Sequence, residues 1–132
     1  MKIPEEAKKL FDAQDIVAFG TADANGVPNV CAVFWKTVTA EDTILILDNF
    51  FKQTKQNLAE NSEVCISFWD TSTEEGYKLK GTATYHTKGQ VFEQGQAWMQ
   101  SKKPGRVPRG VVEVKVNQVF VITPGEHAGE LL

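Results

Sequence analysis

The stretch Asp48-Asn49-Phe50-Phe51-Lys52-Gln53-Thr54 follows an apolar run at residues 44–47 and leads into a helix-like run at residues 55–60. It predicts a strand-to-helix junction that carries a cation, a hydroxyl group and amides. Helix N-termini present unpaired backbone N–H groups and a partial positive charge, so Lys52 and Thr54 would add to an anion site there. From the spacing alone, an ordinary surface lysine beside a capping threonine is the more common explanation. A phosphate site and a bare junction therefore both stay open at this point.

A second segment, residues 29–35, is apolar on both alternating faces of a strand. One face carries Val30, Ala32 and Phe34, and the other carries Cys31, Val33 and Trp35. An antiparallel strand with one face in water would instead alternate with polar residues. We therefore expect a barrel interior to cover one face, and a partner subunit or a ligand to cover the other.

The whole chain predicts three helices and six short strands. We expect helices over residues 4–13, 51–61 and 88–100, and strands over residues 16–21, 29–35, 43–47, 64–69, 77–86 and 112–122. The Asn25-Gly26 turn signal predicts a hairpin over residues 16–36, and Gly81 predicts a bend or a bulge in the fifth strand. Short, closely connected strands with small helical insertions favour a mainly β fold, a closed antiparallel β-barrel.

The composition suits one soluble domain over residues 1–132, since a chain of 132 residues can bury a single core. The formal net charge of -3 argues against a general nucleic-acid binder, which usually has a basic excess. No apolar run approaches the roughly 20 residues of a membrane span. Residues 1–6 lack the apolar core of a signal peptide. We expect a cytoplasmic protein without nucleic-acid or membrane partners.

Neither the cysteines nor the histidines predict a redox pair or a metal site. Cys31 and Cys65 lie in apolar runs and form no CxxC motif, so buried free thiols are expected. His86 and His127 have no ligand-type partner at metal-binding spacing. Glycine-rich nucleotide fingerprints, a P-loop and a nucleophile elbow are absent from the sequence, and no catalytic residue is predicted.

A basic segment, residues 102–110, contains four cations and no acid, and its prolines and glycines keep it irregular. It fits either a solvated loop or a clamp for a phosphate or a substrate. Just before it, Trp98 and Met99 keep helical spacing, which fits packing better than cofactor contact.

The order and spacing of these pieces resemble the pyridoxamine 5′-phosphate oxidase-like, FMN-binding split β-barrel family over residues 5–123. The matching pieces are residues 20–23, residues 26–30, Asp48-Asn49-Phe50 with Lys52, Thr54 and Asn57, residues 64–67 and residues 76–83. The chain is more similar to the small stand-alone FMN-binding members than to the true oxidases. The resemblance implies a six-stranded split barrel that forms a homodimer, with FMN at the subunit interface.

The resemblance also implies roles for individual residues. The segment matching Asn29, Val30, Cys31 and Ala32 would lie along the isoalloxazine ring, and Asp48 and Asn49 would border the flavin. The turn matching Lys52, Gln53 and Thr54 would bind the phosphate. The partner subunit would close the pocket, with Trp98 and Arg106 as the candidate residues.

The resemblance implies an FMN-binding flavoprotein, and we expect an oxidoreductase that acts on a small molecule or passes electrons to a partner. The alternatives are a non-catalytic flavin or nucleotide carrier and a split-barrel relative that uses haem or a deazaflavin. True oxidases of this superfamily carry a C-terminal segment of basic and histidine groups that grips pyridoxamine phosphate. Residues 125–132 do not match such a segment. Pyridoxamine 5′-phosphate oxidase activity is therefore not expected.

Overall fold

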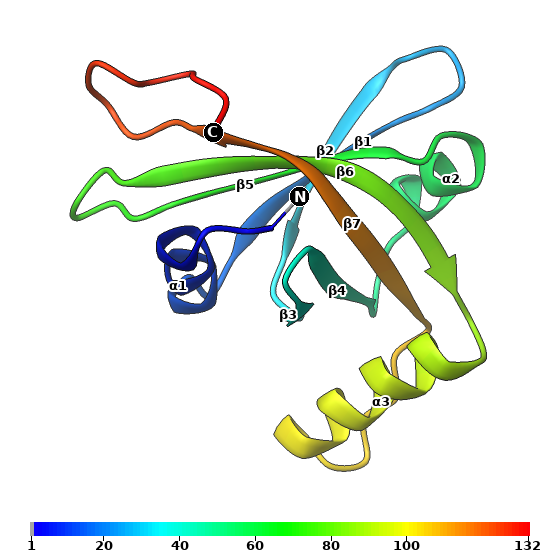
Figure 1. Cartoon of the computed structure of the whole chain (residues 1–132). Helices are drawn as coiled ribbons and strands as arrows, with labels where there is room; N and C mark the ends of the chain where they lie inside the picture. The colour runs from blue at the N-terminus through cyan, green and yellow to red at the C-terminus, as the bar shows by residue number, and fades with distance from the viewer. Residues whose placement is uncertain (1) are drawn as a thin grey trace.

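The computed structural model describes residues 2–132 as an antiparallel sheet curled into a half-barrel with three helices (Figure 1). The strands are β1 (Val17–Ala22), β2 (Pro28–Val33), β3 (Lys36–Ala40), β4 (Thr43–Asp48), β5 (Glu63–Trp69), β6 (Gly76–His86) and β7 (Gly110–Val121). The helices are α1 (Glu5–Ala13), α2 (Gln53–Glu60) and α3 (Gln90–Lys102). The sheet order is β2-β1-β5-β6-β7-β4-β3. The mainly β class and the three helices predicted from the sequence are confirmed.

The predicted number of strands was wrong, because residues 2–132 form seven strands where six were expected. The chain leaves β2 after Val33, and residues 36–40 pair with β4 as β3, with Lys36 opposite Ile46 and Val38 opposite Ile44. Four of the five β3 residues are half-buried, so this strand shows no alternation of buried and exposed positions. The period of two that reveals a strand in a sequence is therefore missing from this segment.

β4 is apolar along its length because both of its faces are covered, and all six of its residues are buried. Ile44 and Ile46 belong to the main core of the half-barrel. The alternate face contributes to a second cluster, which consists of Leu45, Leu47, Met99 and Val111. Met99 comes from α3, which lies beside the N-terminal end of β7 in Figure 1. The helix approaches so closely that a Cβ atom at Gly95 would lie 2.6 Å from Cγ2 of Val111.

α1 packs on the main core through Ala7, Leu10 and Phe11, which are buried at the helical spacing predicted from the sequence. The ring of Phe11 meets that of Phe68 edge-on, with centroids 5.3 Å apart. Burying a side chain of this size stabilises a fold by about 1.5–3 kcal/mol.

None of the three helices described in residues 2–132 is long and apolar enough to cross a membrane.

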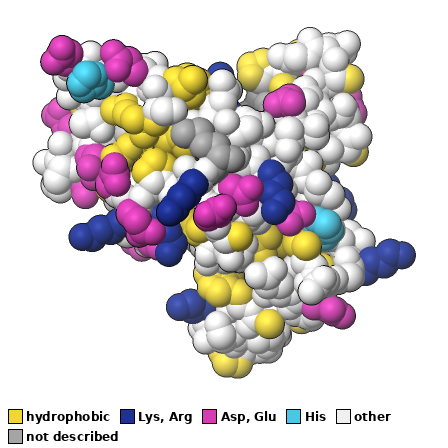
Figure 2. Space-filling model, viewed as in Figure 1, with side chains coloured by type: hydrophobic (Ala, Val, Ile, Leu, Met, Phe, Trp, Pro, Cys, Tyr) yellow, Lys and Arg dark blue, Asp and Glu magenta, His cyan; other side chains and the backbone are white. Residues whose placement is uncertain are grey.

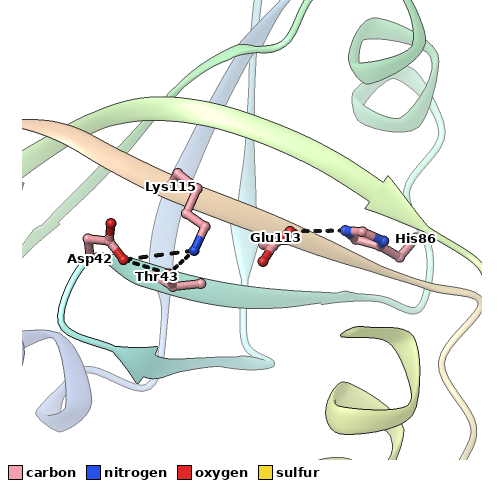
Figure 3. A network of polar contacts seen from close by, with 5 residues as sticks. All are labelled: Asp42, Thr43, His86, Glu113 and Lys115. Atoms are coloured by element: carbon pink, nitrogen blue, oxygen red, sulfur yellow. Dashed lines mark hydrogen bonds and ion pairs between the residues drawn. The ribbon is translucent and has the colours of Figure 1, made fainter. Parts of the chain in front are cut away.

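Charged side chains lie next to one another across the middle of the face shown in Figure 2. Five polar residues of β4, β6 and β7 and the turn before β4 form two groups of contacts here (Figure 3). Lys115 Nζ donates to Thr43 Oγ1 at 2.9 Å and lies 3.9 Å from Asp42 Oδ1. Nε2 of His86 lies 3.1 Å from Oε1 of Glu113. Such exposed or partly exposed pairs contribute little to stability, because water and salt screen them.

Gly81 marks a bulge in the pairing of β6 with β7, as the sequence predicted. Lys80 pairs with Gln118, whereas Gly81 pairs with Val116, so Asn117 is the extra residue. The backbone of β7 approaches so closely that a Cβ atom on Gly81 would overlap the carbonyl oxygen of Lys115. Glycine is required here because two backbones meet without room for a side chain.

We predict that Gly81→Ala lowers the free energy of unfolding by about 1–3 kcal/mol, since the added methyl group must push the β7 backbone away. Urea denaturation followed by circular dichroism measures this change. Thr84→Ala, at an exposed position of the same strand, is the matched control and should change stability by less than about 0.5 kcal/mol. Equal stability of the Gly81→Ala variant and the wild type would contradict the close approach.

Candidate functional site

A pocket of about 680 Å³ opens between β2 and the turn that joins β4 to α2. Its lining residues are 29–35, Leu47, 49–54 and Arg106. Ligand pockets in proteins usually measure about 300–1,000 Å³, so the volume suits a small molecule or a cofactor. All the contact residues predicted from the sequence, except Asp48 and Trp98, lie on this lining.

One wall of the pocket is the outward row of β2 and its extension. Val30 is 68% exposed and Phe34 is 62% exposed, while Val33 on the other face is only 3% exposed. The inward row packs on the core, and Cys31 lies partly buried against it. The sequence predicted that both faces of this strand would need cover, and in the single chain one of them has none.

The pocket lining has a net positive charge. Lys52 and Arg106 are its cations, and the lining residues include no aspartate or glutamate. Lys52 is also the N-cap residue of α2, where no side chain caps the helix and no acid lies in the first turn. No acidic side chain of the first turn therefore competes for the positive end of the α2 dipole and its first backbone N–H groups. This arrangement favours an anionic ligand.

Thr54 connects α2 to β2 through its hydroxyl group. The residue is 3% exposed, and its Oγ1 atom accepts a hydrogen bond from Asn29 Nδ2 at 3.3 Å and donates one to Cys31 Sγ at 3.3 Å. The sequence suggested that this hydroxyl would contact a phosphate. In the structure it already has two protein partners, so its observed role is to hold the two pocket walls together.

A second polar contact docks α2 one turn later. Asn57 is 1% exposed; its Nδ2 atom donates to Thr21 Oγ1 at 3.0 Å, and its Oδ1 atom accepts from Gln53 Nε2 at 2.8 Å. A buried amide costs free energy unless it is hydrogen-bonded. The bond to Thr21 therefore restricts α2 to one position on β1, and the bond from Gln53 satisfies the other half of the amide. The helix that begins at the pocket is positioned by directional polar contacts as well as by packing.

Asp48 lies beneath the turn rather than on the pocket wall. Its side chain is wholly buried, and its Oδ1 atom accepts a hydrogen bond from the backbone N–H of Phe51 at 2.7 Å. Tyr85 donates its hydroxyl hydrogen to the other carboxylate oxygen. The sequence predicted that Asp48 borders a ligand, whereas the structure places it behind Asn49 and Phe51.

The basic segment at residues 102–110 is held in place at several points. Gln100 accepts a hydrogen bond from the backbone N–H of Gly105 at 2.7 Å and donates one to the carbonyl of Arg106. The Arg106 guanidinium lies 6.0 Å from the ring centroid of Trp35 and lines the pocket of its own chain. Arg109 donates to the carbonyl of Phe51 at 2.9 Å. Arg106 is the residue of this segment on the pocket lining, and the clamp for a phosphate or a substrate stays a prediction.

Trp98 lies outside the pocket. Its ring meets that of Trp35 edge-on, with centroids 5.6 Å apart, and it packs against the second hydrophobic cluster. It also lines a neighbouring recess of about 430 Å³ together with Phe34 and Lys102. In the single chain Trp98 therefore supports the pocket from behind Trp35.

Sequence reasoning missed the aromatic part of the lining, which consists of Phe34, Trp35, Phe50 and Phe51. Phe50 is 81% exposed, an unusual environment for a phenylalanine. The available signal was the run of two phenylalanines at a polar turn, where an apolar side chain has no local core to join. No local sequence pattern indicates the contacts of Tyr85 and Arg109 with this turn.

Cys31 faces the pocket as a protonated thiol. Burial raises its pKa, and the negative charge of Asp48 acts in the same direction, while the hydrogen bond from Thr54 partly offsets both. Since thiolates rather than thiols are nucleophiles, Cys31 is expected to react slowly at neutral pH. Because Cys31 lies on the pocket lining, the reactivity of its thiol would report whether a ligand occupies the pocket.

Comparison with known proteins identifies a family over nearly the whole chain. The profile of the pyridoxamine 5′-phosphate oxidase family matches residues 3–123. An uncharacterized protein of Methanocaldococcus jannaschii is 34% identical over 134 residues, which cover 100% of this chain and 89% of that protein. The structure of HupZ from Group A Streptococcus has a TM-score of 0.84 at 30% identity, covering 96% of this chain and 99% of that one.

More distant structures share the fold, and their names refer to different ligands. An FMN-binding protein from Syntrophomonas wolfei has a TM-score of 0.78 at 16% identity, covering 92% of this chain and 87% of that one. HutZ, a haem storage protein of Vibrio cholerae, has a TM-score of 0.70 at 19% identity, with coverages of 92% and 95%. An F420 reductase has a TM-score of 0.67 at 14% identity, with coverages of 89% and 98%. At these identities the likeness extends to the fold alone.

We predict that Cys31 is alkylated by iodoacetamide more slowly than free cysteine at pH 7.5, and that its rate is still rising above pH 9. The raised pKa keeps the thiolate fraction small until the solution becomes alkaline. The Cys65→Ser variant isolates the Cys31 reaction, and mass spectrometry follows it against pH. A rate that reaches its plateau by pH 7.5 would contradict the assigned environment.

Proposed function

This chain belongs to the pyridoxamine 5′-phosphate oxidase family, and we propose that its pocket binds FMN and that the protein is a flavin-dependent oxidoreductase. The observation that carries the proposal is the pairing of an apolar wall on β2 with a cationic strand-to-helix turn in one pocket. FMN has the matching halves, a flat apolar ring system and a phosphate dianion. The absence of aspartate and glutamate from the lining residues supports the same assignment.

The residues of the pocket suit both halves of this cofactor. Val30, Ala32 and Phe34 offer an exposed apolar row against which an isoalloxazine ring would lose its hydration. Lys52 would make a charge-assisted contact with the phosphate, beside the uncapped start of α2. Asn29, Cys31, Asn49 and Gln53 also lie on the lining and would contact the cofactor between these two ends.

Bound FMN would supply the hydride and electron chemistry, and the chain would orient it and limit its contact with water. Lys52, Arg106 and Cys31 are the ionisable side chains of the lining. The first two are cations and the third is a thiol of raised pKa. The described pocket thus has no carboxylate or imidazole that would serve as a general base, which suits oxidation and reduction of a small molecule or electron transfer to a partner protein.

We further propose a homodimer that covers the exposed wall. Three large apolar side chains of the pocket region, Val30, Phe34 and Phe50, are between 62% and 81% exposed in the single chain. Val107 of the basic segment adds a fourth at 59%. Large apolar side chains that are exposed around one pocket favour an interaction site there. A second copy would bury it and bring its own Trp98 and Arg106 toward the cofactor, as the family resemblance implies.

The functions that compete with an FMN-dependent oxidoreductase are a flavin carrier and a protein that binds haem or a deazaflavin. A carrier would use the same pocket without turnover, and haem or a deazaflavin would take the place of FMN, as the names of HutZ and the F420 reductase suggest for those proteins. The lining residues include no histidine, methionine or tyrosine to ligate haem iron, and burial raises the pKa of the lining thiol Cys31, which disfavours the thiolate that would ligate the iron. Oxidation of pyridoxamine phosphate is not proposed, because residues 125–132 fold back on β7 through backbone bonds such as Val121 N–H to Glu130 O at 2.9 Å.

The visible spectrum of the purified protein, reconstituted with FMN if necessary, separates these functions. Flavin bands support the proposal, whereas a Soret band or a deazaflavin spectrum would replace it with one of its rivals. Anaerobic addition of NADH or NADPH, followed by other donors, then tests for reduction of the bound flavin. A flavin that no donor reduces would favour the carrier.

We predict that Lys52→Ala raises the Kd for FMN about tenfold and that for riboflavin less than about twofold, because only FMN carries the phosphate that Lys52 would bind. Quenching of flavin fluorescence measures both constants. Lys9→Ala is the matched control, since it removes an exposed lysine from α1, which contributes no residue to the pocket lining. Equal weakening of FMN and riboflavin by Lys52→Ala would contradict the phosphate assignment.

We predict a dimer at micromolar concentration in sedimentation velocity experiments, and a shift toward monomer in the Val30→Asp variant. The introduced carboxylate would be buried without a partner in the proposed interface. Thr82→Asp, on an exposed position of β6, should leave the association unchanged. A wild-type protein that sediments as a stable monomer would remove the dimer from the proposal.

A further inference from the structure

The turn at residues 49–52 is held from below by one buried carboxylate. Asp48 closes β4, and its side chain is 0% exposed. Its Oδ1 atom accepts the backbone N–H of Phe51 at 2.7 Å, so the carboxylate connects the last residue of β4 to the third residue of the turn. A buried carboxylate is tolerated only when hydrogen bonds and a nearby cation replace its hydration. Asp48 therefore depends on groups from other parts of the fold.

Tyr85 of β6 supplies one of these groups. Its hydroxyl donates to Asp48 Oδ2, 37 positions away along the chain. Glycine at position 110 makes room for this contact, since a Cβ atom there would overlap the Tyr85 ring. Burial raises the pKa of Tyr85, and Asp48 reinforces the shift, so the phenol keeps the proton that it donates.

Arg109 of the basic segment supplies the cation. Its Nη2 atom lies 3.8 Å from Asp48 Oδ2 and donates to the carbonyl of Phe51 at 2.9 Å. Its backbone N–H also donates to the carbonyl of Asp48 at 2.8 Å. Both backbone polar groups of Phe51 are thus engaged, the N–H by Asp48 and the carbonyl by Arg109. The turn is fixed between β4, β6 and the segment that enters β7.

We propose that Tyr85 and Arg109 are positioning residues that hold the turn at residues 49–52 in the conformation that receives the FMN phosphate, Tyr85 through Asp48 and Arg109 through both Asp48 and the carbonyl of Phe51. This inference rests on the proposed FMN site and adds to it two residues that do not line the pocket. Neither side chain would contact the cofactor. Their effect reaches it through Phe51 and Lys52, which do line the pocket.

A positioning role and a purely structural role differ in ligand selectivity. A general loss of stability weakens FMN and riboflavin alike, because both ligands need the folded pocket. Loss of the turn conformation displaces Lys52 and the start of α2, which would face the phosphate, and leaves the apolar row on β2 in place. The ratio of the two dissociation constants therefore reports on the turn alone.

The test compares FMN and riboflavin binding to the wild type, Tyr85→Phe, Arg109→Ala and the double variant. Tyr85→Phe removes only the hydroxyl group and keeps the ring that packs on Gly110. Tyr77→Phe, on the same strand and away from the pocket, is the matched control. Arg109 has a side chain that is 51% exposed, so its replacement opens no internal cavity, and riboflavin binding reports whether each variant still has a folded pocket.

We expect each single variant to raise the Kd for FMN about fivefold to tenfold, while the Kd for riboflavin changes less than about twofold. In the double variant the fold-increase in the Kd for FMN should be smaller than the product of the two single fold-increases, since both side chains act on one carboxylate. An unchanged FMN-to-riboflavin ratio in Tyr85→Phe and Arg109→Ala would overturn the positioning role and leave the FMN site standing. A wild type that binds neither flavin would overturn the FMN site, and this inference with it.

Discussion

The burial of β4 on both faces is the constraint on which the rest of the structure depends. Ile44 and Ile46 face the main core, and Leu45 and Leu47 face α3, so a shift of one residue along the strand would exchange the two sets of contacts. The strand consequently delivers Asp48 and the following turn to one fixed place beside β2. The pocket exists because this rigid strand ends where the edge strand β2 has an uncovered apolar face.

The large features of the fold could be predicted because each had a local signal. Helical spacing marked α1 and α3, alternation marked β6, and a glycine marked its bulge. Much of the candidate site was also predictable, since its lining comes mostly from two continuous stretches, residues 29–35 and 49–54. β3 was missed because its evenly half-buried residues give no period. The positions of Asp48, Tyr85 and Trp98 depend on contacts between distant segments, which no local pattern reports.

Polar contacts, rather than apolar area, decide how α2 sits on the sheet. Thr54 and Asn57 are its buried residues, and each is hydrogen-bonded to the first hairpin. An apolar interface tolerates small slides, whereas a buried hydrogen bond is lost when its geometry fails. A helix seated in this way presents its N-terminus at a defined distance from β2. That precision suits a ligand whose ends would be held by different elements.

The uncovered row on β2 has a consequence for the behaviour of the protein in dilute solution. If the same side chains contact both a bound cofactor and a second copy of the chain, cofactor binding and association stabilise each other through mass action. Retention of the cofactor would then depend on protein concentration. A bound fraction of cofactor that falls on dilution of the protein, while the free cofactor concentration is held constant, would reveal a subunit equilibrium and not a weak pocket.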